Sequence, residues 1–349
     1  MTKLIFTMLL GFTTAAFTGQ ALAQGGTWTT KAPMPTARSS SGAASLNGIV
    51  YAIGGGVGFC TPVSTVEAYD PATDTWTTKA PMPTPRYQLA VVAVNQILYA
   101  IGGGGNCDPG YDQATVEAYN PATDTWTTKA SIPAALDQPS ADVINGIIYV
   151  VDGRYQTATY AYDPATDTWT TKAAVTPFRT GAPAAAAAMN GIMYWTGGSD
   201  SAVDAYSPVT DSWTRKASSM PTPRSPAVGV INCKLYFVGG FGTAVNEAYD
   251  PATDTWTTET PMPTARDASV AVANGVLYAL GGNMINFDKF ATNEAFTPAP
   301  AYAAQVQQPI NPDGSSAFTV RRGVVPVKFT LTQCSVATCA LPPATIAVT

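Results

Sequence analysis

A segment that ends in tryptophan recurs along this chain of 349 residues. Thr27-Trp28 is the first copy, and the sequence DTWTTKA or a close variant then surrounds Trp76, Trp126, Trp169, Trp213 and Trp256. Consecutive copies lie 43 to 50 residues apart. This period is typical of one four-stranded blade of a β-propeller. The spacing therefore predicts an all-β fold before any other feature is considered.

Each interval between tryptophans contains four strand-like pieces. The first is rich in small residues, as in Ala90 to Val94, and suits the crowded axis of a propeller. An Asn-led turn such as Asn47-Gly48 follows, because these residues tolerate the positive φ angles of a two-residue hairpin. The second strand is apolar and ends on glycines, as in IVYAIGG, and the third ends in an aromatic residue. The turn DPATDTW joins two strands in nearly every repeat, which favours turn capping over calcium binding by its carboxylates.

A glycine doublet followed by a tyrosine and then a tryptophan at these spacings resembles the kelch repeat, over about residues 25 to 298. The resemblance implies a six-bladed β-propeller of four-stranded antiparallel blades, which we assign to residues 24–298. Trp28 precedes the first full set of strands, and the set that ends at Phe296 lacks a tryptophan strand of its own. We therefore expect the strand Thr27 to Lys31 to complete the last blade and close the ring.

The first 23 residues have the pattern of a secretory signal. Lys3 precedes an apolar stretch from Leu4 to Phe17, and Ala21-Leu22-Ala23 forms a small-residue cleavage site. We expect cleavage after Ala23, with an uncleaved anchor as the alternative, and no transmembrane span after cleavage. The predicted mature protein is secreted, in the periplasm or outside the cell.

Residues 299–349 differ in composition and contain no repeat. Pro326-Val327-Lys328-Phe329 resembles the PxKF-type segment at the C-terminus of some exported bacterial proteins. Alternating apolar residues from Val325 to Leu331 suit a half-buried strand, so we predict a short C-terminal β segment, part of an Ig-like sandwich. The chain stops within what resembles another strand, and we expect this segment to be truncated.

Export to an oxidising compartment would permit the five cysteines to form disulfides. Cys60 and Cys107 follow the glycine runs of two successive repeats, so a bond between them would join neighbouring blades; two free thiols are the alternative. Cys334 and Cys339 are close enough for a local ring. Cys233 is left over, and we expect a buried or turn-located free thiol.

The chain contains no histidine, which excludes Ser-His-Asp and Cys-His catalysis, HExxH zinc sites and imidazole copper sites. Some kelch-like propellers are copper-radical oxidases, but their histidines have no counterpart here. Charged residues make up 12% of the chain and the formal charge is -5, without a basic cluster, so a nucleic-acid partner is not expected. We predict no metal and no cofactor.

Two kinds of connection share one rim of the propeller, here called the loop-rich rim: those between the second and third strands, and those between one blade and the next. Aromatic and charged residues in these loops suit stacking on a sugar and hydrogen bonding to its hydroxyls. The alternative is that each aromatic covers its own blade. The candidate ligand residues are Phe59, Tyr111, Asp152, Arg154, Tyr155, Asp200, Phe241 and Phe287.

An arginine begins the innermost strand in five of six repeats, which would place a cationic ring at the channel mouth and attract an anion. Each of those repeats also carries an acid two residues before the third-strand aromatic. We therefore predict structural ion pairs within blades. The pairs are Arg38 with Glu67, Arg86 with Glu117, Arg179 with Asp204, Arg224 with Glu247 and Arg266 with Glu294.

The third repeat lacks both members of the pair, with Leu136 and Tyr160 in their places. Simultaneous loss is what an ion pair predicts, because an isolated buried charge is costly. This repeat alone has Asp152 and Arg154 in its glycine loop. The departure indicates either side chains released for function or decay of the repeat.

These features predict an exported, monomeric binding or interaction module that contacts a glycan or a protein partner through the loop-rich rim. The second hypothesis is a metal-independent sugar epimerase or mutarotase, since some six-bladed exported kelch-like proteins are sialic-acid epimerases. Acid–base catalysis by Asp or Glu needs no histidine, but no local motif carries that family's catalytic residues to positions in this chain. The third hypothesis is a structural cell-surface protein.

Overall fold

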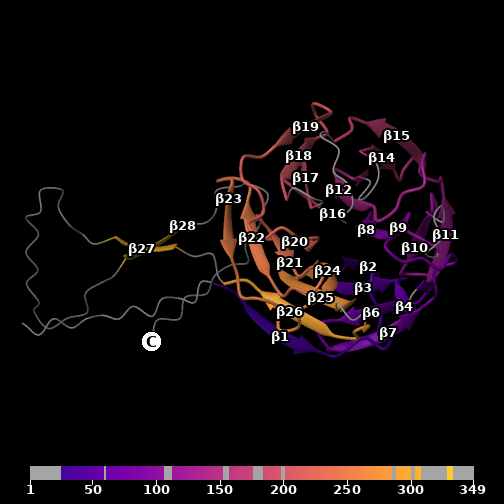
Figure 1. The fold of residues 1–349 in the computed structure, drawn as a ribbon, viewed down its shortest axis with the longest axis horizontal. Helices are drawn as coiled ribbons and strands as arrows, with labels where there is room; N and C mark the ends of the chain where they lie inside the picture. The colour runs from indigo at the N-terminus through magenta and orange to yellow at the C-terminus, as the bar shows by residue number, and fades with distance from the viewer. Residues whose placement is uncertain are drawn as a thin grey trace, which may run out of the picture.

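The computed structural model describes residues 25–58, 60–105, 112–151, 157–175, 184–197, 201–284, 288–299, 303–307 and 328–332. The regular elements of these residues are all β-strands. Six four-stranded antiparallel sheets follow one another around a ring (Figure 1). The predicted six-bladed propeller is confirmed. The proposed signal, residues 1–23, lies outside the described residues.

Each blade contains four strands, and the blades are numbered 1 to 6 in the chain order of their innermost strands. The innermost strands are β2 (Gly42–Leu46), β8 (Ala90–Val94), β12 (Ser140–Ile144), β16 (Ala184–Met189), β20 (Ala227–Ile231) and β24 (Asp267–Ala273). The second strands are β3 (Ile49–Ile53), β9 (Ile97–Ile101), β13 (Ile147–Val151), β17 (Ile192–Gly197), β21 (Lys234–Val238) and β25 (Val276–Asn283).

The outer half of each blade is equally regular. The third strands are β6 (Val66–Asp70), β10 (Val116–Asn120), β14 (Thr159–Asp163), β18 (Val203–Ser207), β22 (Asn246–Asp250) and β26 (Asn293–Thr297). The outermost strands are β7 (Thr75–Lys79), β11 (Thr125–Lys129), β15 (Thr168–Lys172), β19 (Ser212–Arg215), β23 (Thr255–Thr258) and β1 (Thr27–Lys31).

The ring closes through β1, as the position of Trp28 predicts. Strand β1 pairs antiparallel with β26, so that Trp28 lies opposite Phe296. The indole Nε1 of Trp28 donates to the carbonyl oxygen of Thr260, 2.9 Å away, at the end of blade 5. The closure satisfies the edge of β26, which would otherwise present unpaired backbone groups.

The Asp-Pro turns fasten each blade to the one before it. In blade 1, Asp74 Oδ1 accepts hydrogen bonds from the Tyr69 hydroxyl at 2.7 Å and from the backbone N–H of Ala32 at 2.9 Å. Trp76 Nε1 donates to the carbonyl oxygen of the same Ala32 at 2.8 Å. Asp124, Asp167, Asp211 and Asp254 each bond the tyrosine of their own blade and an alanine N–H of the preceding one. The carboxylates therefore cap turns.

Blade 6 shows why its third strand ends in Phe296 rather than tyrosine. Its outermost strand comes from the N-terminus, so no Asp-Pro turn joins it to β26. Without that aspartate, the hydroxyl of a tyrosine would have no acceptor. Phe296 is fully buried and has no hydroxyl group that needs one. Its ring centroid lies 5.1 Å from that of Trp28.

The glycine doublets allow neighbouring blades to approach closely. Gly54 has a φ of 63°, and a Cβ there would come within 2.5 Å of the carbonyl oxygen of Arg86 in the next blade. Gly239 repeats this arrangement against the carbonyl oxygen of Arg266. Only glycine combines the left-handed conformation with this contact at no steric cost.

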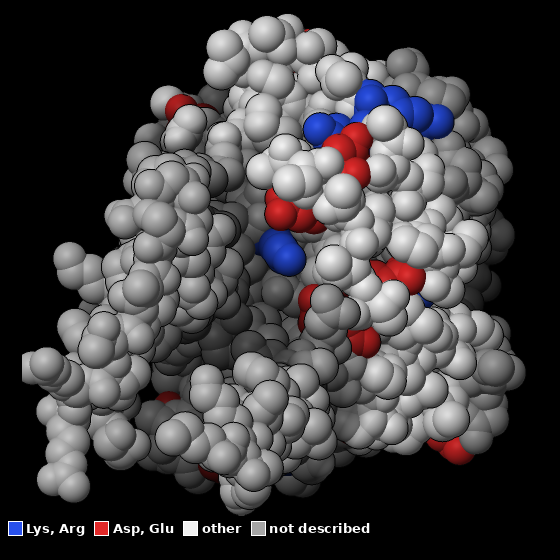
Figure 2. Space-filling view, turned by 90° about the vertical axis from the view of Figure 1, so that its left-hand side faces the viewer, with Lys and Arg blue, Asp and Glu red and all other residues white. Residues whose placement is uncertain are grey.

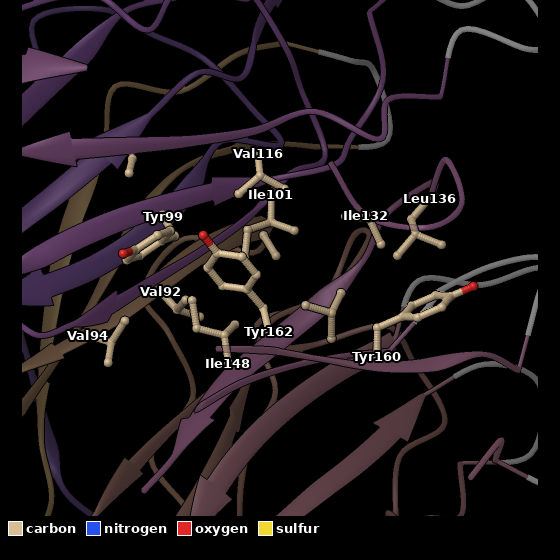
Figure 3. Close-up of a cluster of buried hydrophobic side chains, with 13 residues drawn as sticks. Val92, Val94, Tyr99, Ile101, Val116, Ile132, Leu136, Ile148, Tyr160 and Tyr162 are labelled. Carbon is tan, nitrogen blue, oxygen red and sulfur yellow. The ribbon is translucent and has the colours of Figure 1, made fainter. Parts of the chain in front are cut away.

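The hydrophobic core consists of clusters between adjacent blades rather than one central mass. The cluster between blades 2 and 3 contains Val92 and Tyr99 from one blade and Ile148 and Tyr162 from the other (Figure 3). Burying each large apolar side chain contributes roughly 1.5–3 kcal/mol. Because each blade supplies half of two clusters, stability depends on the complete ring.

Part of the C-terminal segment forms a separate two-stranded sheet. Strand β27 (Ala303–Gln307) pairs antiparallel with β28 (Lys328–Thr332), which contains two residues of the PxKF-type segment. The remaining residues of 300–349 lie outside the described residues. The Ig-like sandwich therefore stays a prediction.

Candidate binding site in the channel and on the loop-rich rim

The two rims of the propeller differ in the length of their connections. At one rim the innermost and second strands meet in two-residue turns such as Asn47-Gly48, both with positive φ. At the loop-rich rim, residues 54–65 connect β3 to β6 and contain the short strands β4 (Gly56–Gly58) and β5 (Thr61–Pro62). Variation between blades is concentrated at this second rim.

The six innermost strands lie around the axis of the ring (Figure 1). They line an open cavity of about 700 Å³. Its walls are mostly alanine, serine, glycine and valine. Small residues leave the space open, as their position on the innermost strand predicts. The charged residues among its described lining are Asp142 and Asp267, and no lysine or arginine lines it there.

Asp142 occupies the middle of β12 in blade 3. Its Oδ1 accepts a hydrogen bond from the backbone N–H of Val143 at 2.7 Å, and its Oδ2 accepts one from Ala188 in blade 4 at 2.6 Å. Burial raises the pKa of Asp142 to about 6, and the two backbone hydrogen bonds oppose that shift. The carboxylate thus links two blades while it lines the cavity.

Asp267 begins β24 in blade 6, on the opposite side of the ring, at the end of the strand that faces the loop-rich rim. Its Oδ1 accepts a hydrogen bond from the backbone N–H of Asn283 at 2.5 Å. Burial raises the pKa of Asp267 to about 6, and the nearby Lys289 lowers it. The ammonium group of Lys289 donates to Ser39 Oγ at 2.7 Å.

Gln138 lies near the start of β12 and also lines the cavity. Its φ is 54°, and Ser40 and Gln88 adopt similar left-handed conformations at the same point of blades 1 and 2. Gln138 is 9% exposed, and its Oε1 has no hydrogen-bond partner. Buried acceptors are normally satisfied, so an unpaired amide oxygen at a cavity wall is unusual.

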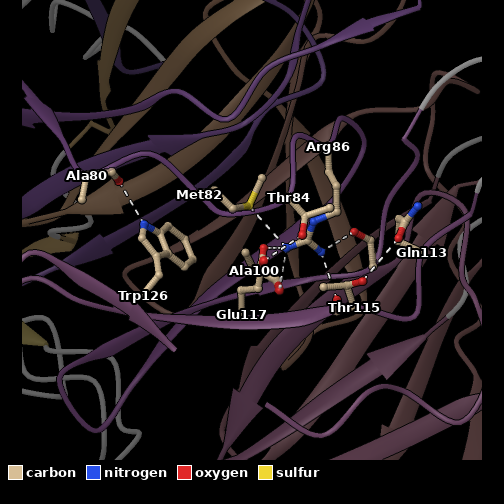
Figure 4. Close-up of polar contacts among 10 residues, drawn as sticks. Ala80, Met82, Thr84, Arg86, Ala100, Gln113, Thr115, Glu117 and Trp126 are labelled. Atoms are coloured by element: carbon tan, nitrogen blue, oxygen red, sulfur yellow. Dashed lines mark hydrogen bonds and ion pairs between the residues drawn. The ribbon is translucent and has the colours of Figure 1, made fainter. Parts of the chain in front are cut away.

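Four of the five predicted ion pairs are present inside their blades. In blade 2, Arg86 and Glu117 are 0% and 2% exposed and their charged groups lie 2.7 Å apart (Figure 4). Arg86 also donates to the carbonyl oxygens of Gly102 and Thr115, and Thr84 donates to Glu117. Arg38 with Glu67, Arg224 with Glu247, and Arg266 with Glu294 make the same contact.

Burial lowers the pKa of each of these four arginines, and the partner carboxylate opposes the shift. Their guanidinium groups lie within the blades and do not line the channel. Figure 2 shows one side of the propeller, on which charged groups are few and blue and red groups lie beside one another. Because these four arginines are paired within their blades and none lines the cavity, the described residues form no cationic ring for an anionic ligand.

Blades 3 and 4 depart from the pairing. Leu136 and Tyr160, 0% and 7% exposed, fill the site in blade 3 as part of a hydrophobic cluster. Arg179, the predicted partner of Asp204 in blade 4, lies outside the described residues. Asp204 accepts a hydrogen bond from Arg215 Nε at 3.1 Å, directly across β18 and β19. The variant DSWTRKA, in which Arg215 replaces a threonine, carried this signal in the sequence.

One of the eight predicted rim residues is described. Phe241 is 55% exposed and lines the cavity mouth. The sequence interpretation missed Val57 and Met284, which are 40% and 38% exposed on the same rim. It also missed Asp142, Asp267 and the role of Gln138. The remaining seven candidates, Phe59, Tyr111, Asp152, Arg154, Tyr155, Asp200 and Phe287, lie outside the described residues.

The disulfide predictions need one correction. Cys60 and Cys233 are both disulfide-bonded, so the expectation that Cys233 is a free thiol is wrong. The count of cysteines could not reveal this, because sequence does not determine pairing. Cys107, Cys334 and Cys339 lie outside the described residues, and the bonds between Cys60 and Cys107 and between Cys334 and Cys339 stay predictions.

No group of three metal-ligating side chains occurs among the described residues. In the same part of the chain, no helix has the length and apolar character needed to cross a membrane.

Comparison with known proteins agrees with this architecture. The fold defines the class first, a six-bladed β-propeller. The Kelch motif matches residues 37–83, 85–133 and 223–263, so this propeller more specifically contains kelch motifs. A solved structure entitled "Structure of YjhT" aligns with a TM-score of 0.64 and 19% identity, over 75% of this chain and 95% of that one. At this identity the likeness shows the fold alone. A search of curated proteins gives no match.

Proposed function

We propose that this protein is a binding module that contacts a protein or glycan partner through its loop-rich rim. Four large apolar side chains of the described residues are exposed. Phe241, Met284 and Val57 lie in the rim loops of the consecutive blades 5, 6 and 1. Exposed apolar side chains grouped in this way are typical of interaction surfaces, and this observation carries the proposal.

A protein partner is favoured over an acidic glycan. The arginines that would have attracted an anion are held in buried ion pairs with Glu67, Glu117, Glu247 and Glu294. What the described rim offers instead is apolar area beside the channel mouth. Kelch propellers commonly mediate protein interactions, which supports the same choice.

Export to the periplasm or the exterior is part of the proposal. The disulfide bonds at Cys60 and Cys233 support an oxidising compartment, and the signal pattern of residues 1–23 supports the route. N-terminal sequencing of the purified protein should give Gln24 as its first residue. An N-terminus at Met1 on exported protein would contradict cleavage, and protein found only in the cytoplasm would contradict export. We propose that the mature protein is a monomer.

The rim surface is tested by changing Phe241, Met284 and Val57 together to serine. The matched control is Val209→Ser, since Val209 is 93% exposed in the turn between β18 and β19, at the opposite rim. Immobilised wild-type protein is used to capture partners from medium and to screen a glycan array. We expect the triple variant to lose at least about tenfold in affinity for what is captured, and the control to retain it. Equal binding by both variants would overturn the rim as the contact surface.

A metal-independent sugar epimerase or mutarotase is the second candidate. The observation that favours it is the pair of cavity carboxyls, Asp142 and Asp267, whose pKa values burial raises to about 6, a range suited to acid–base work. An arginine clamp is missing from the described lining. Time-resolved NMR of sialic-acid anomers with catalytic amounts of protein tests this hypothesis, and an unchanged rate of anomer exchange rejects it.

A further inference from the structure

Blade 3 carries a carboxylate where every other blade has an apolar residue. Asp142 lies opposite Tyr149, the second-strand tyrosine that recurs in all six repeats. The residues opposite the corresponding tyrosine in the other blades are Ala44, Val92, Ala187, Gly229 and Ala271. Five blades fold without a charge at this position, so the propeller itself does not require Asp142.

Among the described residues, the Asp142 carboxylate has hydrogen-bond donors but no cation. The donors are the backbone N–H groups of Val143 and Ala188. Burial raises the pKa of this carboxyl, and the two hydrogen bonds oppose that shift. Each carboxylate oxygen can accept a further hydrogen bond. An anion that is partly removed from water without a counter-ion is costly, which calls for a reason to retain it.

Gln138 provides an independent observation at the same wall. Gln138 lines the cavity and is about nine-tenths buried, and its amide oxygen has no hydrogen-bond partner among the described residues. Asp142 lies four residues further along the chain, in the middle of β12. Both groups are acceptors that a donor in the cavity would satisfy.

The other residues that line the cavity indicate the charge and size of a ligand that could donate to these two acceptors. The cavity's other charged residue among the described lining is Asp267, on the facing blade, and the walls between are small apolar and hydroxyl side chains. A ligand there meets two carboxylates and no cation from the described lining. A volume of about 700 Å³ is in the range of small-molecule sites. A metal ion is far smaller and would need more oxygen ligands than this wall supplies.

We propose that the central channel binds a small organic ammonium ion, with Asp142 as its counter-ion and the amide oxygen of Gln138 as a second acceptor. Charge-assisted hydrogen bonds to the ammonium group satisfy both side chains. Asp267 on the facing blade favours a ligand with a second ammonium group. Of the three rim-contact residues only Phe241 also lines the cavity, and Asp142 and Gln138 are not part of the rim contact.

Three five-carbon probes that differ only in their end groups test the proposal by titration calorimetry of the mature protein at pH 7.5. They are 1,5-diaminopentane, pentane-1,5-diol and glutarate. We expect the diamine to bind at least tenfold more tightly than the diol, and glutarate not to bind. Wild-type protein that binds no diamine, or that prefers glutarate, overturns the proposal without reference to any variant.

Variants then locate the site. Asp142→Asn should weaken diamine binding at least tenfold, and Gln138→Ala should weaken it several-fold. The matched control is Asp163→Asn, which removes a carboxylate of the same blade from an outer turn, where it accepts the N–H of Ala165. Circular dichroism establishes that each variant is folded. Undiminished binding in the Asp142 variant, or equal loss in the control, contradicts the assignment. A double variant that changes only Val57 and Met284 to serine, neither of which lines the cavity, should bind diamine normally.

Discussion

Blades 2 and 3 are neighbours with the same backbone plan and different polar interiors. In blade 2, Arg86 precedes the innermost strand and forms an ion pair with Glu117 of the third strand. In blade 3, Leu136 and Tyr160 fill the corresponding space, within a hydrophobic cluster. The propeller therefore requires this space to be filled and its charges to be paired, but does not require charge. A second difference is Asp142, which occupies the position of Val92. Its charge has no counter-ion among the described residues, and we assign it to ligand binding.

The largest predicted effect comes from breaking the blade 2 pair. Arg86→Leu leaves Glu117 buried without its partner and should lower the free energy of unfolding by about 3–5 kcal/mol. Adding Glu117→Tyr reproduces the blade 3 arrangement and should recover most of the loss. Urea denaturation of the single and double variants measures both. An unchanged midpoint for Arg86→Leu would mean that the pair does not contribute to the fold.

Asp142→Asn should have a smaller effect, of the opposite sign, at neutral pH. The pKa of Asp142 is raised to about 6 in the folded protein from 3.8. The folded state therefore holds its proton more tightly, so this group's contribution to stability is present below about pH 4 and is lost as the pH rises through 6. The shift corresponds to roughly 1–2 kcal/mol once water in the open cavity is considered.

Thermal unfolding of wild type and Asp142→Asn at pH 4 and pH 7.5 measures this difference. We expect the variant to gain stability relative to wild type at the higher pH. Asp267 is present in both proteins, so its own titration does not enter the comparison. A variant that is less stable than wild type at pH 7.5 would show that Asp142 holds blades 3 and 4 together instead of costing stability.

The smallest predicted effect compares the tryptophans of blades 3 and 5. Trp169 Nε1 donates to the carbonyl oxygen of Ala130 at 2.8 Å, whereas Trp256 Nε1 is buried without a partner. Trp169→Phe should cost about 1 kcal/mol through the lost hydrogen bond, and Trp256→Phe should cost less. Urea denaturation of both variants decides. Equal losses would assign the role of these tryptophans to packing alone.

The parts of the fold that sequence could predict are those that recur. The position of Trp28 predicted ring closure because a blade without its own tryptophan strand needs one from elsewhere. Joint absence of Arg and acid in the third repeat predicted internal pairing in the others. The fate of Cys233 could not be predicted in this way, because it depends on which segments meet in space.

The candidate site was less accessible to sequence reasoning. Asp142 stands within an apolar strand and resembles an ordinary surface residue, so attention fell on the variable rim loops. Phe241 was predicted there, while Val57 and Met284 were missed because aliphatic residues in loops give no distinctive pattern.

The sequence by itself determined the number of blades, the closure of the ring, the recurring turns and the ion pairs of four blades, because these depend on contacts within one repeat or between similar neighbours. Only the tertiary structure decided that Asp142 and Gln138 face the same cavity and that Asp267 lies across from them. The reason is geometric. Residues far apart in sequence come to surround one axis only after six blades have packed into a ring.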